Sequence, residues 1–135
     1  MTEPRDSGPS RGDTASPHKG ATGLRRVLNA TRNSADGLSA AWRHESAFRQ
    51  ELLLAVVLVP LALLLDVSGT GKALMIASVL LVLIVELLNS AVEAAIDRIS
   101  LDRHPLAKRA KDAGSAAVMI ALLNVAAVWG LVIFA

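Results

Sequence analysis

Four polar side chains recur at helical spacing within and just after an apolar stretch of this chain. They are Glu86, Asn89, Glu93 and Asp97. Their separations of three, four and four residues would place all of them on one face of a helix. The 24 residues 73–96 contain no other charged or amide side chain. Because an acidic group near the centre of a bilayer costs roughly 2.5–3.5 kcal/mol, two at this spacing predict a functional site.

Two carboxylates and an amide in an apolar helix are compatible with three uses. They could relay protons, hold a hard cation, or join helices in an oligomer without catalysis. Mg²⁺ takes carboxylate oxygens and usually shares its coordination shell with the phosphates of a substrate. Such a site also needs cationic groups on the same side of the membrane. Polar and basic candidates for that side come from three segments: Arg26, Arg32, Glu45, Arg109, Lys111 and Asp112.

Three apolar segments predict three membrane-spanning helices. Residues 52–65 form 14 uncharged residues, about 21 Å of helix, which is short of the ~30 Å hydrocarbon layer unless residues 47–51 continue the helix. The second segment is 73–96, and the third is the uncharged run 113–135. We therefore predict an all-α integral membrane protein with a disordered tail at 1–22. A membrane domain at 23–135 follows, with a surface helix at about 23–46 and spans at about 47–66, 72–98 and 111–135.

The segment before the first span has an apolar stripe and a basic face. Its apolar residues are spaced by three, four and seven: Leu24, Val27, Leu28, Ala35, Leu38 and Trp42. A basic amphipathic helix of this kind suits the membrane–water interface, with its arginines toward anionic headgroups. The alternative is a helix of a soluble bundle.

The distribution of Lys and Arg predicts the orientation in the membrane. Eight precede the first span, one lies in the 66–72 connection, and five lie in the 97–112 connection. Because basic ends stay in the cytoplasm, the N-terminus and the 97–112 connection are predicted to face inward. The C-terminus then faces outward.

Composition excludes several classes of function. The formal net charge of +2 and the four aromatic residues do not suit a nucleic-acid-binding protein. Cysteine is absent, which excludes disulfides, thiolate metal sites and cysteine nucleophiles. The run Gly69–Lys72 resembles the end of a phosphate-binding loop, but its first glycine would fall at Asp66, and Ala73 stands where Ser or Thr is required.

Three stretches carry a resemblance to a known family. They are AAWRHESAFRQE (40–51), VELLNSAVEAAIDRI (85–99) and RAKDAGSAAVMIA (109–121). With the start Gly23–Arg26, the chain resembles the prokaryotic diacylglycerol kinases over residues 23–135. The resemblance implies a homotrimer in the bacterial inner (cytoplasmic) membrane, crossing it three times, with the active site cytoplasmic and the C-terminus periplasmic. It also implies Mg²⁺-dependent transfer of the γ-phosphate of ATP to the hydroxyl of diacylglycerol, giving phosphatidic acid, and no nucleic-acid partner.

The resemblance also implies roles for individual residues. Glu86 is the expected catalytic base, and Glu45 and Glu93 are the expected metal ligands. The expected ATP-binding residues are Arg26, Glu45, Asn89, Glu93, Asp102, His104, Lys111 and Asp112. The expected lipid-binding residues are Arg26, Ala30, Ser39, Trp42, Ala47, Gln50, Glu51, Glu86 and Ser115.

Two questions remain open from the residues alone. Glu86 lies about 15 Å inside the second span when counted from Ile96, so we expect the helix to continue inward past the hydrocarbon boundary.

The identity of the lipid acceptor is also open. Undecaprenol is the other substrate of the family, although residues 48–51 and 109–115 resemble the diacylglycerol branch more closely. A non-catalytic oligomeric scaffold or proton pathway is the third alternative.

Overall fold

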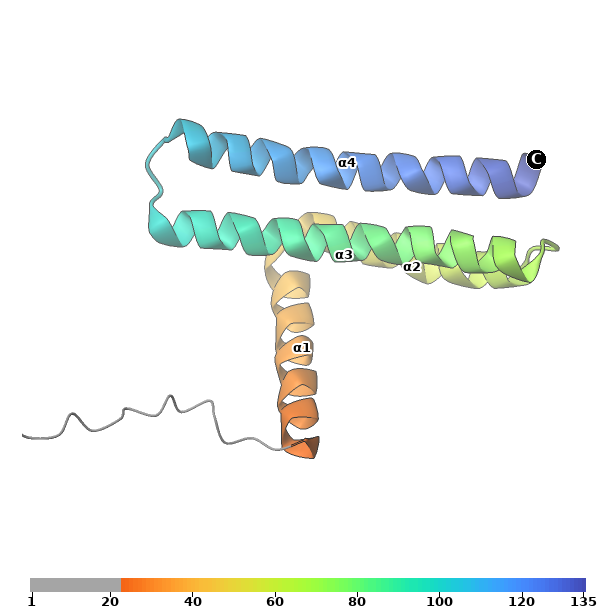
Figure 1. The fold of residues 1–135 in the computed structure, drawn as a ribbon, viewed down its shortest axis with the longest axis horizontal. Coiled ribbons are helices and arrows are strands. Elements are labelled where there is room, and N and C mark those ends of the chain that lie inside the picture. The colour runs from red at the N-terminus through yellow and green to blue at the C-terminus, as the bar shows by residue number, and fades with distance from the viewer. Residues whose placement is uncertain (1–22) are drawn as a thin grey trace, which may run out of the picture. The chain divides into compact units, whose positions relative to one another are not determined.

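The computed structural model describes residues 23–135, which form four helices (Figure 1). These are α1 (Leu24–His44), α2 (Ser46–Leu64), α3 (Gly69–Ile99) and α4 (Pro105–Phe134). No strand occurs among the residues described, so the predicted all-α class is confirmed. The predicted tail at 1–22 lies outside the described residues.

The chain divides into two compact units, Met1–Ala35 and Asp36–Ala135. The described part of the first unit is the beginning of α1, whose side chains are all exposed. In the second unit, α3 packs against both α2 and α4, and the three helices run side by side (Figure 1). The carboxylate stripe predicted from the sequence therefore lies on the helix that has neighbours on two sides.

Helices α2, α3 and α4 are each long and apolar enough to cross a membrane. Their most apolar windows are only 17%, 28% and 6% buried within the chain, so most of this apolar surface faces outward. An outward apolar surface of this extent suits lipid or other helices rather than water. The prediction of three apolar spanning helices is confirmed in length and composition.

The buried hydrophobic residues of the three helices are alanines, two valines, one methionine and one phenylalanine. Phe48 and Met75 are the largest side chains that are fully buried, and Ala62 and Ala121 are buried with them. The Trp129 indole N–H donates to the Met75 carbonyl oxygen over 3.3 Å, which fixes α4 against α3. Alanines at such positions allow the close approach that helix packing in lipid requires.

The glycine-containing run 69–72 forms the first turn of α3. Ser68 is the N-cap residue, and its hydroxyl oxygen accepts from the Gly71 backbone N–H at 3.0 Å. The Lys72 ammonium donates to the Leu63 carbonyl oxygen at 2.8 Å, near the C-terminus of α2. The lysine thus satisfies a backbone acceptor that the helix leaves free, which agrees with the exclusion of a phosphate-binding loop here.

The lengths of α2 and α3 bear on the depth of the carboxylates. Helix α2 begins at Ser46 and has 19 residues, about 28 Å, so residues 47–51 do extend the first span. Helix α3 has 31 residues, about 46 Å, which exceeds a ~30 Å hydrocarbon layer. It is therefore long enough to continue past the boundary at its Ile99 end.

Candidate active site

Glu86 is a buried carboxylate at the centre of a group of acidic side chains. It is only 4% exposed, so it has little access to water, and the charges of Glu45 and Glu93 repel it. Glu51 of α2 is in turn repelled by Glu86, and its Oε2 is buried without a hydrogen-bond partner. Within 23–135, no Lys or Arg forms an ion pair with any of these four carboxylates. Such a group needs a cation or a proton to be stable.

Asn89 connects this carboxylate group to α4. Its side-chain Nδ2 donates to Glu93 Oε1 over 3.4 Å, one helical turn further along α3. Its Oδ1 is buried without a hydrogen-bond partner and points at Gly114. A Cβ at position 114 would collide with this oxygen, so the contact requires glycine.

Glu45 lies at the junction between α1 and α2. It is the N-cap residue of α2, with extended backbone angles, yet its side chain makes no capping hydrogen bond. The Arg49 guanidinium closes the junction by donating to the carbonyl oxygens of Trp42 at 2.9 Å and Arg43 at 3.4 Å. Those carbonyls belong to the last turn of α1 and have no partner within the helix. The Glu45 carboxylate is therefore not used by the helix it precedes.

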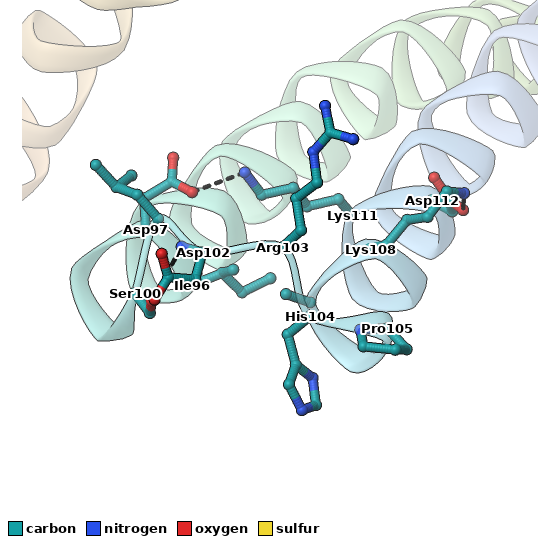
Figure 2. Close-up of a pocket in the computed structure, with 12 residues that line it drawn as sticks. Ile96, Asp97, Ser100, Asp102, Arg103, His104, Pro105, Lys108, Lys111 and Asp112 are labelled. Atoms are coloured by element: carbon teal, nitrogen blue, oxygen red, sulfur yellow. Dashed lines mark hydrogen bonds and ion pairs between the residues drawn. The ribbon is translucent and has the colours of Figure 1, made fainter.

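A pocket of about 670 Å³ opens at the connection between α3 and α4 (Figure 2). Four of the predicted ATP-binding residues line it: Asp102, His104, Lys111 and Asp112. The ammonium of Lys111 lies 2.7 Å from Asp97 Oδ1, and Lys108 pairs with Asp112 one turn away. The pocket thus brings the ammonium groups of Lys108 and Lys111 next to carboxylates and apolar side chains.

His104 begins α4. It is the N-cap residue, and its Nδ1 accepts from the Leu106 backbone N–H at 3.2 Å, with Pro105 in the first helical turn. Proline suits this position because its missing N–H would be unpaired there in any case. Since Nδ1 is used by the cap, only the Nε2 of this histidine is available to a ligand in the pocket.

The other predicted site residues are distributed over both units. Arg26 and Ala30 belong to the first unit, and the remaining lipid positions on the surface of the second unit are exposed: Ser39, Trp42, Ala47, Gln50 and Ser115. In the part of the chain described, no three His, Asp or Glu side chains are placed to hold a metal ion together. Two features were missed from the sequence. The first is the ion pair between Asp97 and Lys111, and the second is the contact between Asn89 and Gly114. The small residues 113–117 were the only sequence feature that pointed to the second contact.

Comparison with known proteins decides the family. The sequence profile described as "Prokaryotic diacylglycerol kinase" matches residues 32–133. The chain belongs to this family. It is 60% identical over 118 residues to "Diacylglycerol kinase" of Pseudomonas aeruginosa, which covers 87% of this chain and 96% of that protein. The chain is also 51% identical to "Diacylglycerol kinase" of Haemophilus influenzae, over 84% of this chain and 96% of that protein. It is 49% identical to "Diacylglycerol kinase" of Escherichia coli K12, over 80% of this chain and 88% of that protein.

The family assignment confirms the resemblance drawn from the motifs. The matched region includes every residue of the carboxylate group and the whole α3–α4 pocket, but it begins after Arg26 and Ala30. The roles predicted for individual residues stay predictions.

Proposed function

We propose that this protein transfers the γ-phosphate of ATP to the hydroxyl of diacylglycerol, giving phosphatidic acid and ADP. The observation that carries the proposal is the match of nearly the whole membrane domain to relatives named diacylglycerol kinase, at 60% identity for the Pseudomonas aeruginosa protein. The geometry supports it, because a buried carboxylate, that of Glu86, and a pocket with two lysines occur in one small helical bundle. Phosphoryl transfer depends mostly on positioning and charge neutralisation, so a soluble-kinase fold is not required.

The donor set suits a divalent cation, for which we propose Mg²⁺. Glu45 and Glu93 supply hard carboxylate oxygens that form no ion pair with a Lys or Arg in residues 23–135. Two carboxylates are enough, because Mg²⁺ keeps waters and substrate phosphates as its other ligands. When bound, the ion would neutralise charge on the triphosphate. Asn89 would steady Glu93 through its Nδ2, which leaves the buried Oδ1 against Gly114.

The chain's own residues can perform the remaining steps. The lipid hydroxyl oxygen forms a bond to the γ-phosphorus while the bond to the β,γ-bridging oxygen breaks and ADP leaves with that electron pair. The hydroxyl proton goes to the Glu86 carboxylate, which is only 4% exposed to water. Lys111 would carry positive charge to the phosphate oxygens at the mouth of the pocket.

We further propose a homotrimer in the bacterial inner membrane, with the N-terminus and the active site cytoplasmic. Ala91 and Ala95 are small, lie four residues apart on α3, and are exposed in the single chain. In lipid, small residues at this spacing permit close approach of another helix. The outward surface of α3 is therefore suited to packing against a second copy.

The proposed function is tested with purified protein in mixed micelles, radiolabelled ATP and Mg²⁺. Diacylglycerol, undecaprenol and lipid-free micelles are supplied separately, and the labelled lipid is measured. Rapid labelling of diacylglycerol with little labelling of undecaprenol is expected. Labelling of undecaprenol alone would reverse the choice of acceptor. If the protein consumed no ATP with either lipid, the non-catalytic alternative would remain.

Replacing Gly114 by alanine is expected to lower kcat about tenfold with little change in stability. The new methyl group forces Asn89 to rotate away from Glu93. Alanine meanwhile improves helix propensity by about 0.8–1.0 kcal/mol, which offsets part of the packing cost. Gly130→Ala is the matched control, since no atom lies within 4 Å of its added Cβ. Thermal unfolding and kcat are measured for both, and a fully active Gly114→Ala protein would contradict the role of Asn89.

Replacing Arg49 by methionine is expected to lower kcat about fivefold. The two α1 carbonyls lose their charged donor, at a cost of about 1 kcal/mol, and the junction that carries Glu45 becomes less fixed. Arg43→Met is the control, because only the backbone carbonyl of Arg43 takes part in this contact. The Mg²⁺ concentration for half-maximal activity should rise for Arg49→Met alone. Equal effects of the two variants would show that only the loss of positive charge matters.

A further inference from the structure

Asp97 and Lys111 form an ion pair that joins two helices. Asp97 lies in the last turns of α3, and Lys111 lies in the second turn of α4, fourteen residues later. The Lys111 Nζ lies 2.7 Å from Asp97 Oδ1. The dashed line in Figure 2 marks this pair between the two helices. Both residues line the α3–α4 pocket, together with Asp112.

This pair contributes little to folding stability. The two side chains remain 40% and 47% exposed, and exposed ion pairs are weak because water screens them. The neighbouring pair of Lys108 and Asp112 lies within a single helix, so it cannot fix one helix against another. Of the ion pairs between described residues, that of Asp97 and Lys111 is the one that connects α3 to α4.

The pair has a clear effect on where the lysine charge lies. A free lysine has four rotatable bonds, and its ammonium is distributed over many positions. Binding to Asp97 uses one of the three ammonium donors and leaves two for a ligand. Asp97 is also four residues after Glu93, so the held ammonium lies about one helical turn along α3 from a carboxylate proposed to bind Mg²⁺.

We propose that Asp97 is a positioning residue for the nucleotide: it holds the Lys111 ammonium at the mouth of the α3–α4 pocket, where the two remaining N–H donors meet the triphosphate. This inference rests on the proposed function, in which Lys111 contacts ATP. In this role Asp97 acts through the lysine, because its own negative charge would repel the phosphates. Its removal therefore changes nucleotide binding through the lysine and leaves lipid binding intact.

The test compares Asp97→Asn with Asp97→Glu in the full-length protein. For Asp97→Asn, KM for MgATP is expected to rise about tenfold while KM for diacylglycerol is unchanged. Asp97→Glu keeps the carboxylate and should restore KM for MgATP to within about threefold of the unchanged protein. Asp66→Asn is the matched control, because it makes the same substitution in the exposed turn at the other end of α3. An unchanged KM for MgATP in Asp97→Asn, or equal increases in both KM values, would overturn the proposal.

Two further variants separate positioning from simple attachment of the helices. In Lys111→Met, adding Asp97→Asn should raise KM for MgATP by less than twofold more, since the held group is already gone. The exchanged pair, Asp97→Lys with Lys111→Asp, restores the link between α3 and α4 but moves the ammonium. We expect it to stay impaired for MgATP, and full recovery would contradict the positioning role.

Direct binding of a fluorescent, non-hydrolysable ATP analogue distinguishes this inference from the proposed function. If the unchanged protein binds the analogue but does not phosphorylate diacylglycerol, the proposed function fails. The inference is then still decided by whether Asp97→Asn weakens analogue binding about tenfold. Equal binding by Asp97→Asn and the unchanged protein would reject it whatever the lipid acceptor is.

Discussion

Glu86→Gln is expected to lower kcat for diacylglycerol phosphorylation by about 10²–10⁴-fold, the range that general base catalysis contributes. Glutamine has nearly the same shape as glutamate but cannot accept the hydroxyl proton. The side chain is 4% exposed, so water has little access to replace it as a base. Removing a charge from a group of mutually repelling carboxylates should also leave the protein folded, or stabilise it.

The measurements for this variant are kcat, KM for both substrates, and the elution volume of the protein in detergent. KM for MgATP and the oligomeric state should be unchanged. Glu3→Gln, in the segment before the described residues, is the matched control and should keep full activity. A Glu86→Gln protein with normal kcat would end the assignment of Glu86 as the base.

The second large effect is expected on the metal requirement. Glu93→Gln and Glu45→Gln should each raise the Mg²⁺ concentration for half-maximal activity about tenfold or more, because a neutral amide replaces an anionic ligand of a hard cation. Both carboxylates are without a cationic partner in residues 23–135, so neither substitution breaks an ion pair there. The hydrogen bond from Asn89 to Glu93 can also be kept, because the side-chain oxygen of glutamine still accepts, so the loss of activity reports on the metal.

A Mg²⁺ titration at fixed ATP measures this effect. The double variant should be little worse than either single variant at low Mg²⁺, since both side chains are proposed to hold one ion. Strictly additive losses would point to two separate sites. A normal Mg²⁺ requirement in both single variants would remove Glu45 and Glu93 from the proposed metal site.

Much of this architecture follows from local sequence patterns. The three uncharged or nearly uncharged stretches predicted α2, α3 and α4, because the length of an apolar run sets how far a helix can extend through lipid. The spacing of Glu86, Asn89 and Glu93 predicted a shared helical face, because 3.6 residues per turn is a property of the backbone alone. The basic amphipathic pattern of residues 24–44 likewise predicted α1.

The helix ends were less well determined by the sequence. Helix α4 begins at Pro105, six residues before the predicted span, because His104 and Pro105 form a favourable start to a helix outside the apolar run. Helix α3 extends to Ile99 and so carries Asp97 to the α3–α4 pocket. Hydropathy describes the part of a helix that suits lipid, whereas capping and hydrogen bonding decide where the helix begins and ends.

What the sequence determined by itself was the family, the helices and the face on which the carboxylates lie. Only the tertiary structure decided that Lys111 meets Asp97 and that Asn89 meets Gly114. Periodicity fixes neighbours within one helix, but the rotation and register of one helix against another depend on how their side chains pack. In α3 and α4 that packing includes the contact of Trp129 with Met75 and the close approach of Gly114 to Asn89, and it brings Lys111 beside Asp97.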